Sequence, residues 1–325
     1  MAKRIQISQH GDVDVLEYVD FEPRVPKANQ VQIRNHAIGL NFIDTYYRSG
    51  LYSPPSLPSG LGTEGAGEVI AIGDSVTHCK VGDRVAYCTG PLGAYSEIHT
   101  LAESHVLHLP NDISFEQAAA CLLKGLTTQY LLCQTYPVKE GDIILFHAAA
   151  GGVGSIACQW AKAIGAKLIG TAGSTAKIER AKALGAWQVI NYHEEDVVQR
   201  VKELTNNAKC PVVYDSVGKD MWERSLDCLA PRGLMVSFGN SSGAVTGVNL
   251  GILNQKGGLY VTRPSLAWYA NSHEKLQAMA NELFDLISSK KIIIDINQRF
   301  PLADVAKAQQ QLTARKTTGS TILLV

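Results

Sequence analysis

Residues 143–154 read IILFHAAAGGVG, a short apolar run that leads into a segment rich in alanine and glycine. The four leading apolar residues are typical of a strand buried on both faces of a parallel sheet. Apolar residues then recur at helical spacing, which predicts a helix over Val153–Ile164. Where a strand is followed by a glycine-rich turn and then a helix, the N–H groups at the helix N-terminus can bind a dinucleotide pyrophosphate. Because Ala149, Gly151 and Gly154 occupy the three fingerprint positions, we predict a dinucleotide site here.

The same alternation of apolar runs and helical patterns continues on the carboxyl side of this stretch. A second helix is expected over Thr175–Leu184. With right-handed crossovers, such an alternation predicts an α/β fold with a doubly wound parallel sheet. The six predicted strands are Ile143–Phe146, Lys167–Gly170, Gln188–Ile190, Val212–Tyr214, Leu234–Ser237 and Leu259–Val261.

The segments that flank this alternation differ from it in pattern. Residues 1–124 contain short apolar runs separated by glycine and proline, which indicates a β-rich module. The last stretch holds one long helix, near Glu274 to Ser288, and a terminal strand, Ser320–Val325, which we expect to pair with the amino-terminal module. We therefore predict a β-rich domain made of 1–124 plus 265–325, interrupted by a Rossmann domain over 125–264.

Composition excludes several classes of partner. Of 325 residues, 46% are hydrophobic and 18% are charged, and 30 Lys and Arg balance 30 Asp and Glu. Without net charge there is no field to attract nucleic acid or anionic lipid, so neither is an expected partner. No apolar run approaches the ~20 residues of a membrane span, and no signal peptide is recognisable, so we expect a cytoplasmic protein. The seven cysteines form no Cys-x-x-Cys pair that would bind zinc.

Cofactor choice should depend on the sequence about twenty residues after the glycine-rich turn, where an NAD site offers a carboxylate to the ribose. Residues 171–177 read TAGSTAK, and no carboxylate occurs before Glu179. Ser174 can cap the next helix, and the charge of Lys177 suits a phosphate. We therefore predict NADPH rather than NADH.

Two other motifs suggest different chemistry and are rejected. Residues 239–243, GNSSG, match the Gly-x-Ser-x-Gly pattern of serine hydrolases. That pattern needs a helix directly afterwards, whereas the residues that follow are β-branched or glycine. His99, His105 and His108 lie in one region but lack the spacing of a zinc set, so no metal is expected there.

Five segments of the chain carry a recognisable family pattern: Asn41–Asp44, Leu61–Gly67, Gly82–Val85, Lys124–Thr127 and Ala148–Gly154. Together they resemble the zinc-free quinone oxidoreductases of the medium-chain dehydrogenase/reductase superfamily, a group that includes zeta-crystallin. The resemblance covers essentially the whole chain. It implies a GroES-like β-rich catalytic domain around the Rossmann domain, and NADPH-dependent reduction of a quinone.

The resemblance also implies that the enzyme works without zinc. Zinc alcohol dehydrogenases of the superfamily carry cysteine where Asn41 stands and histidine where Thr63 stands, and neither Asn nor Thr is a strong zinc ligand. Without zinc to polarise an alcohol, the substrate should already be electrophilic. Quinone reduction is the first expectation. An NADPH-dependent enone or alkenal reductase is the alternative, and a cofactor-binding protein without catalytic activity is a third.

The family pattern, carried onto matching positions, also implies the site residues. The acceptor pocket is expected to consist of Asn41, Asp44, Tyr46 and Tyr52. Contacts with the cofactor are expected from Phe42, Asp44, Thr127, Tyr130, Gly152, Val153, Gly173, Ser174, Lys177, Tyr192, Val217, Phe238, Gly239, Asn240, Ser241, Pro264, Ser265 and Leu266. The run Gly257–Val261 is expected at a sheet edge, where a second copy of the chain would pair to form a homodimer.

Overall fold

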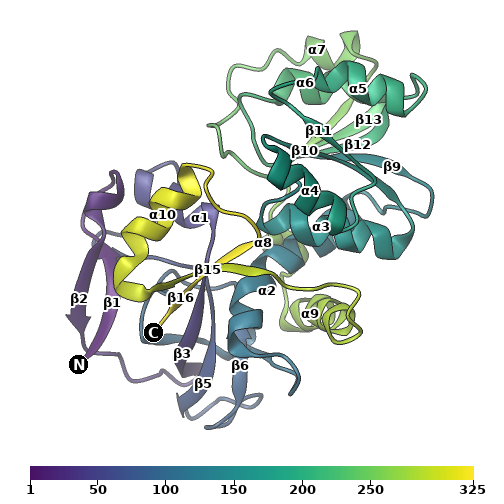
Figure 1. Ribbon diagram of the computed structural model, residues 1–325. Coiled ribbons are helices and arrows are strands. Elements are labelled where there is room, and N and C mark those ends of the chain that lie inside the picture. The colour runs from purple at the N-terminus through teal and green to yellow at the C-terminus, as the bar shows by residue number, and fades with distance from the viewer. The chain divides into compact units, whose positions relative to one another are not determined.

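The computed structural model describes residues 1–325, which form two compact units (Figure 1). The first unit comprises residues 1–124, 270–288 and 294–325. The second unit comprises residues 125–269 and 289–293. None of the helices combines the length and the apolar character that crossing a bilayer requires.

The second unit is built on a single six-stranded sheet. All its strand pairs are parallel, in the order β11-β10-β9-β12-β13-β14. Each of the six predicted strands is present, and the doubly wound order is confirmed. The strands are β9 (Ile143–Phe146), β10 (Lys167–Ala172), β11 (Gln188–Asn191), β12 (Cys210–Asp215), β13 (Leu229–Ser237) and β14 (Tyr260–Thr262).

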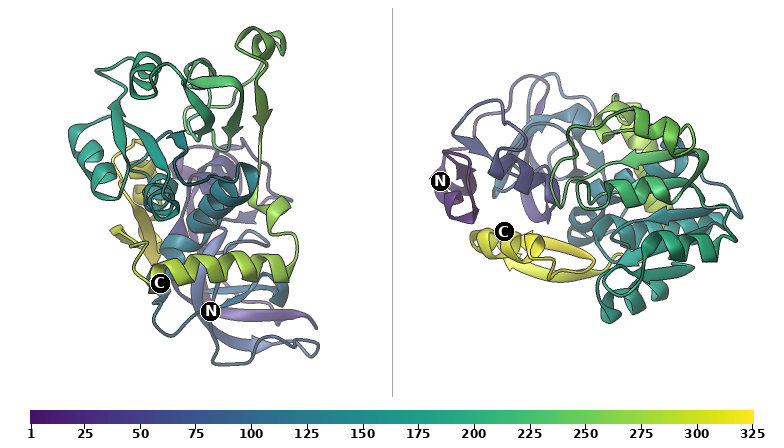
Figure 2. Two further views of the ribbon diagram at one scale, coloured as in Figure 1. Left: turned by 90° about the vertical axis from the view of Figure 1, so that its right-hand side faces the viewer. Right: turned by 90° about the horizontal axis from the view of Figure 1, so that it is seen from above.

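Helices cover both faces of this sheet (Figure 2). This explains why its central strands are continuous apolar runs: Leu145, Ile169 and Val213 are fully buried in one core cluster. The first crossover helix ends at Gly165, which has a φ of 88° and donates to two helix carbonyls. The helices are α3 (Gly152–Ile164), α4 (Thr175–Ala183), α5 (Val197–Leu204), α6 (Trp222–Asp227), α7 (Gly251–Gln255) and α8 (Leu266–Tyr269).

The first unit is β-rich and holds two sheets. A three-stranded sheet has the order β2-β1-β4, and a seven-stranded sheet has the order β15-β16-β3-β5-β6-β8, with β7 also paired to β3. Its core is a separate cluster that includes Ile33, Val69 and Tyr87. The strands are β1 (Ala2–Ile7), β2 (Glu17–Phe21), β3 (Gln30–Leu40), β4 (Ser59–Gly60), β5 (Glu64–Ile72), β6 (Arg84–Tyr87), β7 (Ile98–Ala102), β8 (Leu107–His108), β15 (Ile296–Pro301) and β16 (Ser320–Leu324).

Helices in and beside this unit were only partly anticipated from the sequence. The long helix expected near Glu274 is α9 (His273–Ser288), while α1 (Phe42–Ser49) and α10 (Val305–Thr313) were not predicted. The helix α2 (Phe115–Gln129) continues from the first unit into the second and ends in a π-helical turn, η3 (Tyr130–Thr135). The short 3-10 turns are η1 (Val13–Val15), η2 (Glu103–His105) and η4 (Leu302–Asp304).

The carboxyl-terminal strand returns to the amino-terminal module as expected. Strand β16 pairs antiparallel with β3, with Leu323 opposite Ile38. Strand β15, which was not predicted, pairs with β16 in parallel. Burial along β15 alternates between half-buried and exposed, so it has no continuous apolar run that would mark it as a strand.

Candidate active site

The glycine-rich turn lies at the switch point of the second unit. Strands β9 and β12 are neighbours at the centre of the sheet, with the rest of the order running outward on either side. Between β9 and α3 the chain reverses through Ala148, which has a φ of 56°. A Cβ on Gly154 would overlap the carbonyl oxygen of Ala148 and lie 2.7 Å from the Cα of Ala149. Only glycine at this position lets helix and turn pack so closely.

The N-terminus of α3 suits an anionic group. Its N-cap is Gly151, which has no side chain and makes no cap hydrogen bond. The first N–H groups of a helix lack acceptors within the helix, so those at Gly152 and Val153 can bind phosphate oxygens. The predicted pyrophosphate residues therefore lie where a dinucleotide requires backbone donors.

Four predicted cofactor residues gather at the carboxyl ends of β10 and β11. Ser174 is the N-cap of α4, as predicted, although its side chain makes no cap hydrogen bond. Lys177 lies half-buried in the first turn of the same helix. The ring of Tyr192 covers Gly173 so closely that a Cβ there would overlap the phenol oxygen.

The loops after β12, β13 and β14 hold more of the predicted residues of this unit. A Cβ on Gly239 would lie 2.5 Å from the carbonyl oxygen of Ser216, so these two loops pack backbone to backbone. The guanidinium of Arg263 donates to the carbonyl oxygen of Gly239 at 3.0 Å and holds the β13 loop. No helix begins after Gly243 until α7, so the GNSSG segment lacks the helix that a serine hydrolase needs.

Tyr130 opens the π-helical turn η3, a feature that often occurs at functional sites. Its ring stacks on Tyr269 with centroids 4.6 Å apart and 11° between the planes. Burial raises the pKa of Tyr130, whose hydroxyl is also hydrogen-bonded to Thr127. The hydroxyl of Tyr214 donates to the carbonyl of Leu131 at 3.0 Å, which satisfies an acceptor in the irregular turn.

In the first unit, the predicted acceptor residues lie on α1 and in the loop after it. Asn41 is the N-cap, and its backbone N–H donates to Oδ2 of Asp44 at 2.8 Å. Tyr52 contacts Tyr46 edge to face, with centroids 5.3 Å apart. The ring of Phe42, also in α1, lies with its centroid 6.5 Å from that of the Tyr46 ring. The helix thus brings these five residues together, three of them half-buried aromatic rings.

Behind α1 lies a buried polar network that sequence reasoning missed. Glu64 on β5 is fully buried and accepts hydrogen bonds from Nδ2 of Asn41 at 2.7 Å and from the N–H of Leu123 at 2.7 Å. Lys124 forms an ion pair with the same carboxylate at 3.4 Å. Glu64 and Lys124 both lie in segments that carry the family resemblance. The sequence pattern that could have indicated the network is a charged residue, Glu64, at the start of an apolar strand.

Asp44 is also fully buried, and its environment controls its charge. Oδ2 accepts from the hydroxyl of Tyr95 at 2.7 Å, whereas Oδ1 has no partner. Burial raises the pKa of Asp44 to about 7, against the opposing effects of Tyr95, the backbone of Asn41 and Lys124. The carboxyl can therefore gain or lose a proton near neutral pH, with Oδ1 as the oxygen free to carry it.

The three histidines considered for a metal have separate partners. The ring of His99 contacts Tyr87, His105 contacts the hydroxyl of Thr89, and His108 is hydrogen-bonded to the carboxylate of Asp83. No group of three or more His, Cys, Asp or Glu side chains in the chain has a geometry that could hold a metal ion.

Comparisons with known proteins agree with this arrangement. The family model described as zinc-binding dehydrogenase matches residues 152–282, and that described as alcohol dehydrogenase GroES-like domain matches residues 27–111. The chain is 67% identical to a quinone oxidoreductase of Pseudomonas aeruginosa and 60% identical to quinone oxidoreductase 1 of Escherichia coli, each over 100% of both chains. It is 38% identical to a 2-haloacrylate reductase of Burkholderia, over 98% of this chain and 97% of that one.

Solved structures give the same result. The crystal structure of an Escherichia coli quinone oxidoreductase complexed with NADPH matches with a TM-score of 0.99 at 60% identity, over 100% of both chains. The quinone oxidoreductase of Pseudomonas syringae matches with a TM-score of 0.99 at 66% identity, again over 100% of both chains. The chain therefore belongs to the quinone oxidoreductase family of the medium-chain dehydrogenase/reductase superfamily, as the resemblance of its motifs indicated.

Proposed function

We propose that this chain is an NADPH-dependent quinone reductase that works without zinc. The observation that carries the proposal is the close-packed turn at the switch point, with the uncapped N-terminus of α3 beside it. The relatives named quinone oxidoreductase, and the relative solved with NADPH, support the same assignment. When bound, NADPH supplies the reducing electrons, as a hydride when both move together.

The chain's own residues bind and orient the cofactor. Gly152 and Val153 donate backbone N–H groups to the pyrophosphate, and Gly173, Ser174 and Lys177 hold the 2′-phosphate. Because the hydroxyl of Ser174 makes no cap hydrogen bond, the N–H groups at the start of α4 stay open to a phosphate. The remaining contacts come from Phe42, Thr127, Tyr130, Tyr192, Val217, Phe238, Gly239, Asn240, Ser241, Pro264, Ser265 and Leu266. Asp44 is fully buried and acts through the first turn of α1 rather than by touching the cofactor.

The acceptor is bound by α1 and the loop that follows it. Asn41, Tyr46 and Tyr52 supply a polar amide and two half-buried phenols, which suit a flat aromatic molecule with two oxygens. Asp44 lies behind them, where its carboxyl keeps the first turn of α1 in place. The test is Asn41→Ala together with Tyr52→Phe. We expect a raised KM for quinone, and unchanged quinone turnover in both variants would place the pocket elsewhere.

Two observations support chemistry without zinc. The amide of Asn41 is already engaged by Glu64, and the charge of Glu64 is balanced by Lys124. A carboxylate paired with lysine and an amide do not make a zinc site. Metal analysis of the purified protein should find no stoichiometric zinc, and one tightly bound zinc per chain would refute this part of the proposal.

Enone reduction is the second candidate, and the 2-haloacrylate reductase among the relatives favours it. An activated double bond and a quinone are both electrophilic enough to accept a hydride without a metal. The deciding experiment follows anaerobic NADPH oxidation by metal-free protein across a panel of quinones, enones and alcohols. We expect quinones to turn over fastest and alcohols not at all. Faster turnover of unsaturated aldehydes would favour the alternative.

Quaternary structure, domain roles and location complete the proposal. Strand β14 is the edge of the parallel sheet, and Tyr260 on it is 57% exposed, so we infer a homodimer formed by pairing of two such edges. Sedimentation at micromolar concentration should give a dimer, and a monomer would contradict it.

We further infer that 125–264 acts as the dinucleotide-binding domain, that 1–124 plus 265–325 acts as the catalytic domain, and that the enzyme is cytoplasmic.

A further inference from the structure

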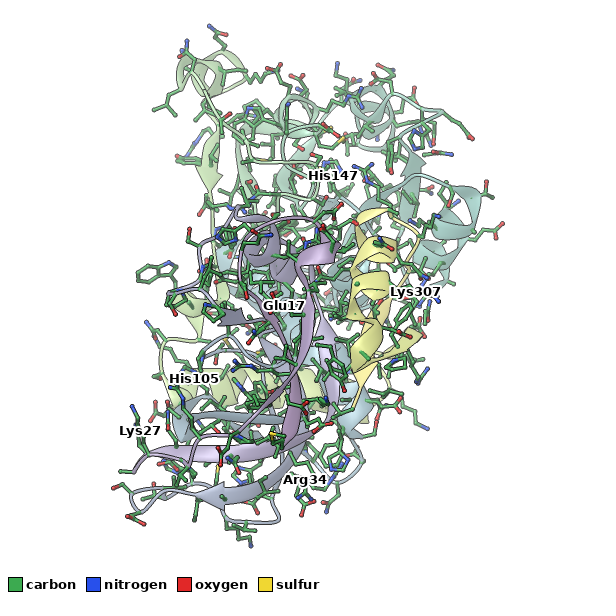
Figure 3. All side chains as sticks on the ribbon, turned by 90° about the vertical axis from the view of Figure 1, so that its left-hand side faces the viewer. Glu17, Lys27, Arg34, His105, His147 and Lys307 are labelled. Carbon is green, nitrogen blue, oxygen red and sulfur yellow. The ribbon has the colours of Figure 1, made fainter.

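We propose that His147 is a positioning residue that fixes the carboxyl ends of four strands, beside the cofactor site, in one arrangement before NADPH binds. The inference rests on the proposed function, because it concerns how the site for NADPH is held. His147 directly follows β9 and lies inside the second unit (Figure 3). Its side chain is fully buried, as are those of Asp215 and Ser225.

The imidazole of His147 joins two elements that are distant in sequence. Its Nδ1 lies 3.0 Å from Oγ1 of Thr171 on β10, and its Nε2 lies 3.0 Å from Oγ of Ser225 on α6. The hydroxyl of Ser225 donates in turn to Oδ2 of Asp215, at the end of β12, across 3.1 Å. Because water cannot replace these partners, each polar atom depends on the next for its hydrogen bond.

The proton positions follow from the chemistry of the carboxylate. The carboxylate of Asp215 can only accept hydrogen bonds, so the hydroxyl of Ser225 donates its single proton to Asp215. The oxygen of Ser225 then accepts from the Nε2–H of His147. Nδ1 then carries a lone pair and accepts from Thr171, whose oxygen accepts the N–H of Ala148 at 3.3 Å. Burial lowers the pKa of His147, although the charge of Asp215 opposes this effect. The lowered pKa keeps the ring neutral. Every donor points from the glycine-rich turn toward Asp215.

Asp215 extends this chain of hydrogen bonds to two more loops. Its Oδ1 accepts the N–H groups of Val217 at 2.6 Å and Gly218 at 3.0 Å. The carbonyl of Val217 accepts from both the backbone N–H and the hydroxyl of Ser242, each at 2.8 Å, in the loop after β13. The loop after β9, the carboxyl end of β10 and the loops after β12 and β13 are thus tied together, and residues proposed to bind the cofactor lie in or directly beyond each of them. Such prior ordering reduces the entropy lost on binding.

The test compares NADPH affinity, measured by fluorescence titration, in wild type, His147→Phe and Ser225→Ala. We expect each variant to raise the Kd for NADPH about tenfold. The KM for quinone should change less than about twofold, since the acceptor residues are elsewhere. The double variant should bind no more weakly than the weaker single variant, because either change breaks the same chain. His99→Phe removes another buried histidine outside the network and should leave NADPH affinity unchanged.

Measurements on the cofactor-free protein separate this inference from the proposed function. Nitrogen NMR of the wild type should find His147 neutral, with its proton on Nε2. Hydrogen exchange of the Val217 and Gly218 amides should be faster in Ser225→Ala than in the wild type. Ser225→Ala also tests the proposal by itself if His147→Phe does not fold. Wild-type affinity in both variants, unchanged amide exchange, or a proton on Nδ1 would overturn the positioning role. If wild type itself fails to bind NADPH or to reduce quinones, the proposed function fails, while the tautomer and exchange data still test the network.

Discussion

The hydroxyl of Tyr95 donates to Oδ2 of Asp44 across 2.7 Å, and neither side chain has exposed surface. Burial raises the pKa of Tyr95 well above its ordinary value, so the phenol keeps its proton and acts as the donor. Oδ2 of Asp44 also accepts the N–H of Asn41, while Oδ1 is unpaired. The first turn of α1, which carries the proposed acceptor residues, is therefore anchored by a carboxyl that titrates within the physiological range.

The first prediction concerns stability against pH. The pKa of Asp44 is raised from 3.8 to about 7 in the folded chain, so between these values the folded state holds a proton that the unfolded state has released. The contribution of Asp44 to stability is therefore complete below pH 3.8 and decreases by up to about 1.4 kcal/mol per pH unit as pH rises toward 7. Asp44→Asn should remove this slope.

Urea unfolding of both proteins at several pH values between 5 and 8 measures the difference. Because all other titrating groups are shared, subtraction of the two curves isolates Asp44. Parallel curves over this range would show that the carboxyl is ionised throughout, contrary to the expectation.

The second prediction concerns the buried ion pair. Lys124→Met would leave the carboxylate of Glu64 buried without a countercharge, although Asn41 and Leu123 still donate to it. Removing one partner of a buried pair costs about 3 kcal/mol or more, whereas replacing both can be nearly neutral. We expect Glu64→Gln combined with Lys124→Met to be more stable than Lys124→Met alone. Equal unfolding free energies for Lys124→Met and wild type would count against a charged Glu64.

The doubly wound sheet was predictable because its signal is local. Each buried parallel strand appears as an apolar run, and glycine at 154 is required by backbone contacts within a few residues. Strand β15 was missed because its residues alternate between half-buried and exposed, and only its pairing with β16 makes it a strand.

The buried networks could not be predicted from the sequence, since they depend on strand order. The two partners of His147 lie 24 and 78 positions away along the chain. Nothing in the sequence around His147 distinguishes it from an ordinary core histidine. Only the placement of β10 and α6 beside β9 brings Thr171 and Ser225 to its two nitrogens.

The third prediction tests the close packing of the glycine-rich turn. Gly154→Ala places a methyl group against the backbone of Ala148 and Ala149, which cannot move aside as a side chain would. We expect a loss of about 1–3 kcal/mol in stability, as for other overpacked sites, and a Kd for NADPH raised about tenfold. In the matched control Gly151→Ala, the added carbon meets only the Ala148 oxygen at 3.2 Å, so its effects should be smaller. Calorimetry and fluorescence titration compare the two, and equal losses would contradict the packing argument.

The last prediction concerns the choice of NADPH over NADH. Lys177 lies in the first turn of α4, near the position proposed for the 2′-phosphate, and Lys177→Glu replaces an attractive charge with a repulsive one. A hydrogen bond between charged groups contributes about 1.5–3 kcal/mol, so the Kd for NADPH should rise about tenfold to a hundredfold. NADH has no 2′-phosphate, so its affinity should change little. Lys182→Glu makes the same charge change at an exposed position in the last turn of α4 and should affect neither cofactor. Equal weakening of NADPH and NADH by Lys177→Glu, or no weakening at all, would remove Lys177 from the proposed phosphate site.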